Sequence, residues 1–132
     1  MIQKLKEYFA ANDDVTLVFL FGSYSVNRAM QDSDVDIAIW FKNPDDLKII
    51  NKIWLDVELL LNKSVDILRL NYASPTVAWT SLRGIPLAIK DYKLYLKLIL
   101  NVSAEAEDSQ NFIFGLWKLR NQIKREQNVT IK

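Results

Sequence analysis

The sequence predicts an α/β (α+β) domain in which helices pack on one β-sheet. Short apolar runs rich in β-forming residues alternate with longer segments whose apolar residues recur at helical spacing. The 132 residues fit a single domain, predicted over 1–132, and half of them are hydrophobic, which is enough to build a core. Three glycines and three prolines leave little sequence for linkers.

The first elements are a helix over residues 2–11 and a strand over 15–21. The strand sequence, VTLVFLF, is short, apolar and rich in β-formers, which predicts burial on both faces of the sheet. Gly22 ends this strand, and residues 23–32 are polar and irregular. The short connection to the next strand allows an antiparallel pair.

The second strand is predicted over residues 34–41 (DVDIAIWF), and Asn43-Pro44 stops it. Asp45 then follows as the N-cap of a helix that runs to about Leu61. This order is typical of a sheet with a helix packed against it, and both a parallel and a mixed sheet satisfy it.

A third strand is predicted over residues 65–70 (VDILRL), followed by a helix from Ser74 to the neighbourhood of Gly84, a C′ glycine. Residues 85–89 form a short fourth strand, placed at an edge because Pro86 does not suit a central strand. The four strands and their helices define a core over about 15–89.

A C-terminal helical segment over about 91–125 completes the chain. Asp91 caps it, and it contains one or two helices with a break between residues 101 and 108. Its second half carries a broad apolar stripe that packs on the sheet or binds a partner, and packing on the sheet is the preferred reading. The stripe consists of Phe112, Ile113, Leu116, Trp117, Leu119 and Ile123.

The composition excludes several kinds of chemistry. The chain has no cysteine and no histidine, so it has no disulfides, no thiolate zinc site and no Ser-His-Asp triad. Catalysis must use carboxylates, lysine, tyrosine, hydroxyls or a metal bound through oxygen. The N-terminus lacks a signal peptide and no apolar run is long enough to span a bilayer, so we expect a cytoplasmic protein without a membrane partner.

Asp34 and Asp36 are the strongest candidate for a metal site. Residues two apart on a strand point to the same face, so both carboxylates emerge side by side. Like charges so close repel each other, and a divalent cation relieves the repulsion. Mg²⁺ prefers carboxylate oxygens together with water and substrate phosphates. The alternative is a solvated or capping Asp-x-Asp, which in isolation is about as frequent.

Two further features support this candidate. Gly22-Ser23 ends the first strand, where glycine lets the backbone approach a phosphate and the turn exposes N–H groups and a hydroxyl. Asp66 interrupts an apolar strand, and it joins the other two acids if the third strand lies beside the second. Three carboxylates can hold two metal ions. The alternative for Asp66 is an ion pair with Arg69 or Lys63.

Together these residues resemble a known family. Gly22-Ser23, then ten residues, then Asp34-Val35-Asp36, matches the GS-x10-D-x-D signature of the DNA polymerase β nucleotidyltransferase superfamily. The segment LFGSYSVNRAMQDSDVDIAIWF is similar to the minimal nucleotidyltransferases, or MNT proteins, and VDIL at 65–68 looks like their strand with the third acid. The resemblance covers about 15–89. It implies a polymerase β-like fold with a mixed sheet of about four strands.

The resemblance also implies a chemistry. Asp34 and Asp36 would ligate Mg²⁺, with two ions expected, and Asp66 would complete the metal site or activate the attacking hydroxyl. Gly22 and Ser23 would hold the triphosphate of ATP, whose AMP is transferred with release of pyrophosphate. Many small members have Arg-Gly where this chain has Val26-Asn27. Arg28 is the neighbouring cation that would replace the missing charge.

MNT proteins commonly pair with HEPN toxins, which are RNases. The resemblance therefore implies a protein adenylyltransferase that acts as an antitoxin by adding AMP to a tyrosine of its HEPN partner. One alternative is an antitoxin that inhibits by binding alone. Another is a small-molecule enzyme similar to aminoglycoside nucleotidyltransferases, disfavoured because only about 40 residues follow the fourth strand. A net charge of +1 speaks against direct nucleic-acid binding.

Overall fold

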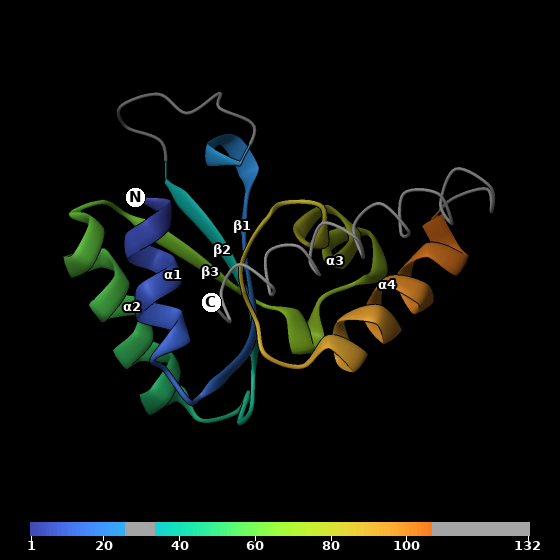
Figure 1. The fold of residues 1–132 in the computed structure, drawn as a ribbon, viewed down its shortest axis with the longest axis horizontal. Coiled ribbons are helices and arrows are strands. Elements are labelled where there is room, and N and C mark those ends of the chain that lie inside the picture. The colour runs from blue at the N-terminus through green and yellow to red at the C-terminus, as the bar shows by residue number, and fades with distance from the viewer. Residues whose placement is uncertain (26–33, 107–132) are drawn as a thin grey trace, which may run out of the picture.

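Four strands form one mixed sheet, and helices cover both of its faces (Figure 1). The computed structural model describes residues 1–25 and 34–106, with side chains through residue 102. The strands are β1 (Val15–Phe21), β2 (Val35–Phe41), β3 (Val65–Arg69) and β4 (Ile85–Ile89). The helices are α1 (Ile2–Ala10), α2 (Leu47–Leu61), α3 (Pro75–Leu82) and α4 (Tyr92–Ala106), with 3-10 turns η1 (Gly22–Tyr24) and η2 (Leu70–Tyr72).

The strand order is β3-β2-β1-β4. β1 pairs antiparallel with both β2 and β4, whereas β2 and β3 are parallel. The predicted mixed sheet of four strands is therefore confirmed, and the short connection after β1 does make an antiparallel pair. β1 is central, which explains why its sequence is apolar on both faces.

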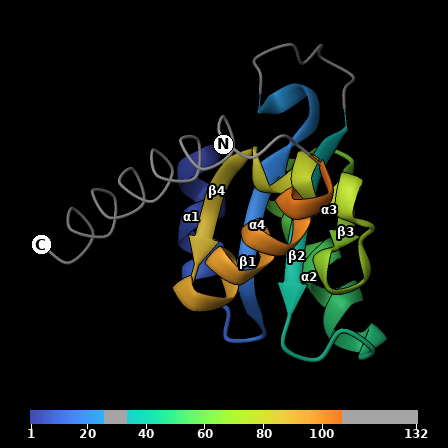
Figure 2. The same ribbon diagram turned by 90° about the vertical axis from the view of Figure 1, so that its right-hand side faces the viewer.

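Two apolar layers hold the helices on the sheet. On one face α1 and α2 pack through Leu5, Phe9 and Ile53 against the side of β2 that carries Val35, Ile37 and Ile39. On the other face α3 and α4 pack through Leu82, Tyr95 and Ile99 against Leu17, Phe19 and Ala38. Figure 2 shows α3 and α4 lying in front of the sheet, with α1 and α2 behind it. With both faces covered, the predicted site residues Gly22, Asp36 and Asp66 lie near one end of the sheet.

Four predicted boundaries are wrong by one residue. The first helix, predicted to reach residue 11, ends at Ala10. Ladder pairing of β2 starts at Val35, so Asp34 stands just before the strand. β3 ends at Arg69 because Leu70 already belongs to η2. The N-cap of α2 is Asp46, whose Oδ1 accepts the N–H groups of Lys48 and Ile49.

The predicted cap, Asp45, has a different partner. Its carboxylate accepts a hydrogen bond from the Tyr72 hydroxyl at 2.7 Å, which joins the start of α2 to η2. Asp45 and Asp46 are equivalent N-cap candidates in the sequence. The hydrogen bond from Tyr72, 27 residues beyond Asp45, decides between them.

The C-terminal elements agree with the prediction as far as the structure describes them. Gly84 follows the C-cap Arg83 of α3, and a Cβ atom there would overlap the Leu20 carbonyl oxygen. Pro86 lies on the edge strand β4. Asp91 caps α4 by accepting the Leu94 N–H at 3.0 Å.

α4 is unbroken through Ala106, so the expected break does not fall within 101–106. The rest of the predicted segment, including the apolar stripe, lies outside the described residues. Within 1–25 and 34–106, no helix is long and apolar enough to cross a membrane.

The end of β2 depends on one side chain. The Asn71 side-chain oxygen accepts the Phe41 N–H at 2.9 Å, and its amide nitrogen donates to the Phe41 carbonyl at 3.0 Å. Asn71 therefore pairs with β2 as a strand residue would, where β3 has already ended.

We expect Asn71→Ala to lower the free energy of unfolding by about 1–3 kcal/mol, because it leaves the Phe41 backbone groups without partners. Urea unfolding measures the change. Asn51→Ala, at an exposed position on α2, is the control and should change stability by less than about 0.5 kcal/mol. Equal effects of the two substitutions would contradict the role given to Asn71.

Candidate active site

The first predicted motif lies where β1 ends. Gly22 and Ser23 begin the turn η1, which Figure 1 shows at the upper end of β1. Gly22 has φ +74°, a left-handed conformation that glycine adopts without strain. Ser25 closes the turn, since its hydroxyl and its N–H both donate to the Gly22 carbonyl, at 2.7 and 3.1 Å.

The second motif touches the first. Phe21 and Asp36 are partners in the antiparallel ladder, so the end of β1 lies beside the start of β2. A Cβ atom on Gly22 would overlap the Asp36 Oδ2 atom and would lie 3.1 Å from its Cγ. Two separate features therefore require glycine at this position: the left-handed backbone conformation and the Asp36 carboxylate that fills the space of a side chain. The two halves of the signature form one structural unit.

The third acid stands on the neighbouring strand. β3 pairs with β2 in parallel, with Asp66 directly opposite Asp36. Both side chains share a face with Ala38 and Leu68, which belong to the layer covered by α3 and α4. The condition set from the sequence, that the third strand lies beside the second, is met.

The electrostatics agree with a group of acids. Burial raises the pKa of Asp36 above its usual value, and the charges of Asp66 and Asp34 raise this pKa further. Asp34 and Asp66 are exposed, while Asp36 is half-buried beside Gly22. The site therefore favours any cation that can bind between the carboxylates.

Magnesium suits these donors, since all three are carboxylates at one end of the sheet. Asp36 and Asp66 face each other as a pair, with Asp34 one residue before β2. In the part of the chain that the structure describes, no three acidic side chains lie close enough together to hold a metal ion as they stand. The three-carboxylate metal site therefore stays a prediction.

The cations considered as partners of Asp66 are used elsewhere. Arg69 donates to the Pro44 carbonyl at 3.0 Å and lies over the Tyr72 ring. Lys63 lies over the ring of Tyr24, 5.8 Å from its centroid. Among the described side chains, no ion pair joins Asp66 to either cation. The predicted phosphate contact Arg28, like Val26-Asn27, falls outside the described residues.

Two residues beside the site were not singled out from the sequence. Trp54 and Glu58 on α2 bond to the backbone of Val65, the residue before Asp66. Their spacing of four places them on one side of the helix, which was the available signal. The sequence does not show which segment they contact, because that depends on the packing of α2 beside β3.

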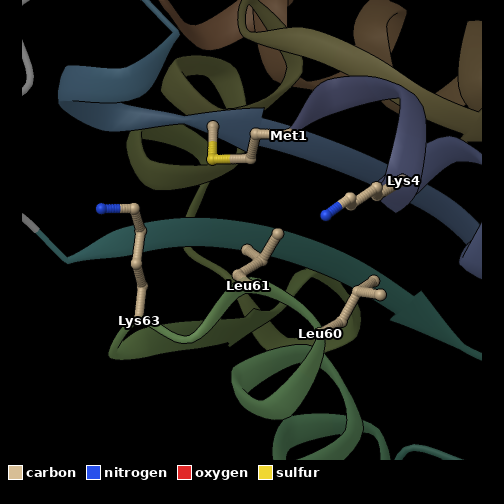
Figure 3. A pocket seen from close by; sticks show the side chains of 5 residues that line it. All are labelled: Met1, Lys4, Leu60, Leu61 and Lys63. Atoms are coloured by element: carbon tan, nitrogen blue, oxygen red, sulfur yellow. The ribbon is translucent and has the colours of Figure 1, made fainter.

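A small hollow lies away from the acids. It has a volume of about 160 Å³ and is lined by Met1, Lys4, Leu60, Leu61 and Lys63. Figure 3 shows Met1 above Leu61, with the two lysines on either side. It contains none of the predicted site residues, and we assign it no function.

Comparison with protein families identifies the chain. The family model of Polymerase beta, Nucleotidyltransferase matches residues 3–93, more than half of the sequence, so the chain belongs to this family. The match spans all three acids and Gly22-Ser23. A search of curated proteins gives no significant match.

Solved structures with a similar fold include a toxin–antitoxin complex and a putative minimal nucleotidyltransferase. A toxin–antitoxin structure with AMP-PNP has a TM-score of 0.59 and 18% identity, over 98% of this chain and 94% of that one. A putative minimal nucleotidyltransferase has a TM-score of 0.54 and 27% identity, over 62% of this chain and 84% of that one.

A third structure contains a tri-AMPylated HEPN toxin from Shewanella oneidensis in complex with its MNT antitoxin. Its TM-score is 0.50 with 18% identity, over 99% of this chain and 96% of that one. At such identities the likeness shows the fold, and the resemblance to the MNT family inferred from the sequence is confirmed.

We expect Gly22→Ala to destabilise the chain by about 2–4 kcal/mol, combining a left-handed alanine with the overlap at Asp36. In an Asp36→Ala background the Oδ2 and Cγ atoms are removed and only the Cβ contact at 3.3 Å is left, so a cost of about 1–2 kcal/mol should remain. A double-mutant cycle by urea unfolding gives the coupling directly. Additive effects would show that the two motifs are not in contact.

The raised pKa of Asp36 makes a second prediction. Ionising this carboxyl costs folding free energy, and the cost is absent well below its usual pKa of 3.8 and complete above the folded-state pKa. In buffer free of divalent cations, Asp36→Asn should therefore raise Tm at about pH 7, and the gain should vanish toward about pH 3. Asp13→Asn, at an exposed position between α1 and β1, controls for the loss of one negative charge. A gain that is independent of pH would contradict the argument.

Proposed function

We propose that this chain transfers AMP from ATP to a tyrosine hydroxyl of a HEPN toxin and thereby acts as its antitoxin. The observation that carries the proposal is the pairing of Asp36 with Asp66 beside a glycine turn that leaves no room for a side chain. A glycine turn at the end of a strand presents backbone N–H groups that can bind a phosphate. The neighbouring carboxylates can hold the cation that balances the charge of that phosphate. Family membership supports nucleotidyl transfer, and the AMPylated HEPN toxin bound to an MNT antitoxin supports the acceptor.

Each residue of the site would have its own role in the transfer of AMP. Gly22 and Ser23 would receive the triphosphate through backbone N–H groups and the serine hydroxyl. Asp34, Asp36 and Asp66 would hold Mg²⁺, which supplies positive charge against the triphosphate and lowers the pKa of a bound hydroxyl. The acceptor oxygen then bonds to the α-phosphorus, the bond to the β-phosphate oxygen breaks, and pyrophosphate leaves. The hydroxyl proton passes to a nearby base, for which Asp66 is the candidate.

A second candidate function is inhibition of the toxin by binding alone. The observation that favours it is that no three acidic side chains within 1–25 and 34–106 are gathered closely enough for a metal ion. In that case the fold would serve as a binding module.

Mass spectrometry of the partner separates the two functions. After incubation with ATP, Mg²⁺ and this chain, we expect the HEPN protein to gain the mass of one AMP or a multiple of it. The double variant Asp34→Asn/Asp36→Asn should abolish the gain, because it removes two of the three charges. Asp45→Asn, the same chemical change at an exposed position near the far end of β2, should keep it. Toxin inhibition with no change of mass would overturn the enzymatic proposal.

A further inference from the structure

Among the described strands, β3 lies at the edge of the sheet and has β2 as its one strand neighbour. In the order β3-β2-β1-β4 its inner side pairs with β2, and the Val35 N–H donates to the Ser64 carbonyl at 2.9 Å. Carbonyl groups alternate along a strand, so the polar backbone groups of Val65 point to the outer side. Unpaired groups there would cost free energy, because Val65 is buried.

Two side chains of α2 take the place of the missing strand at this residue. The Trp54 Nε1 atom donates to the Val65 carbonyl at 2.6 Å, and the Val65 N–H donates to the Glu58 Oε2 atom at 3.3 Å. Trp54 and Glu58 are four residues apart and therefore lie on one side of the helix. Both are half-buried, which limits competition from water.

The bonds sit one residue before Asp66. Val65 pairs with Val35, and the next pair is Asp66 with Asp36. A slip of β3 by one residue would turn Asp66 to the opposite face, since side chains alternate along a strand. β3 has only five residues and pairs with β2 in parallel. The backbone hydrogen bonds of so short a parallel edge strand stabilise its register only weakly.

We infer that Trp54 and Glu58 are positioning residues that fix the register of β3 and so keep the Asp66 carboxylate opposite Asp36. They act through the Val65 backbone and touch no substrate. The inference rests on the proposed function for its consequence in catalysis, while the register itself is measurable without any reaction.

Metal affinity tests the consequence. Mn²⁺ replaces Mg²⁺ as a probe, and its binding to the full chain is followed by electron paramagnetic resonance, with Asp36→Asn as the reference for a lost site. We expect Trp54→Phe and Glu58→Leu to weaken Mn²⁺ binding about tenfold, as for groups that orient metal ligands. Glu58→Gln keeps an oxygen acceptor for the Val65 N–H and should bind nearly as the unsubstituted chain does.

The control for general destabilisation is Asn71→Ala, which loosens the other end of β2. If Asn71→Ala weakens Mn²⁺ binding as much as Glu58→Leu at an equal loss of Tm, the positioning role is wrong. Unchanged Mn²⁺ affinity in Trp54→Phe and Glu58→Leu would overturn it as well.

Thiol bridging tests the register directly, since the chain has no cysteine of its own. The double variant Asp36→Cys/Asp66→Cys should react rapidly with dibromobimane, which fluoresces on bridging two nearby thiols. Adding Glu58→Leu or Trp54→Phe should slow the bridging several-fold, and adding Glu58→Gln should not. Equal rates in all backgrounds would contradict the inference. If the unsubstituted chain transfers no AMP but the bridging rate falls in the Trp54→Phe and Glu58→Leu backgrounds, the proposed function is wrong and the positioning role stands.

Discussion

The contact between Gly22 and the Asp36 carboxylate is the constraint on which the site depends. It requires a residue without Cβ and with positive φ at the end of β1, and it requires β1 and β2 to be antiparallel neighbours. Once both conditions hold, the turn and the first acid lie side by side although 14 positions separate them in the chain. The turn cannot move away without breaking the pairing of Phe21 with Asp36.

The site is built at a cost in stability. Asp36 is half-buried, and the negative charges of Asp66 and Asp34 act on it, so the folded chain disfavours its ionised form. The two apolar layers offset this cost, because β1 and β2 supply fully buried side chains to both of them. A carboxyl group whose pKa is raised by burial and by neighbouring acids is a candidate for a functional site.

The acids also differ in how firmly the fold holds them. Asp36 lies within a central strand with ladder partners on both sides. Asp66 lies on an edge strand, and its register depends on bonds from α2 to Val65. Asp34 precedes the ladder altogether and borders residues 26–33, which the structure does not describe. The three carboxylates therefore differ in how many backbone pairings hold them in place.

The sequence by itself determined the elements and the motif, because apolar periodicity, glycine and proline act over a few residues. The pattern left the sheet parallel or mixed, and only the family resemblance implied a mixed one. It placed β1, β4 and the caps of α3 and α4 correctly, since their signals are local. Only the tertiary structure decided that Asp46 caps α2, because Asp45 is taken by Tyr72 across 27 residues. It also decided that Asp66 pairs with Asp36. The packing of α2 beside β3 likewise decided that Trp54 and Glu58 bond to the backbone of Val65. These are contacts between segments distant in the chain, and their partners are chosen by packing rather than by neighbouring residues.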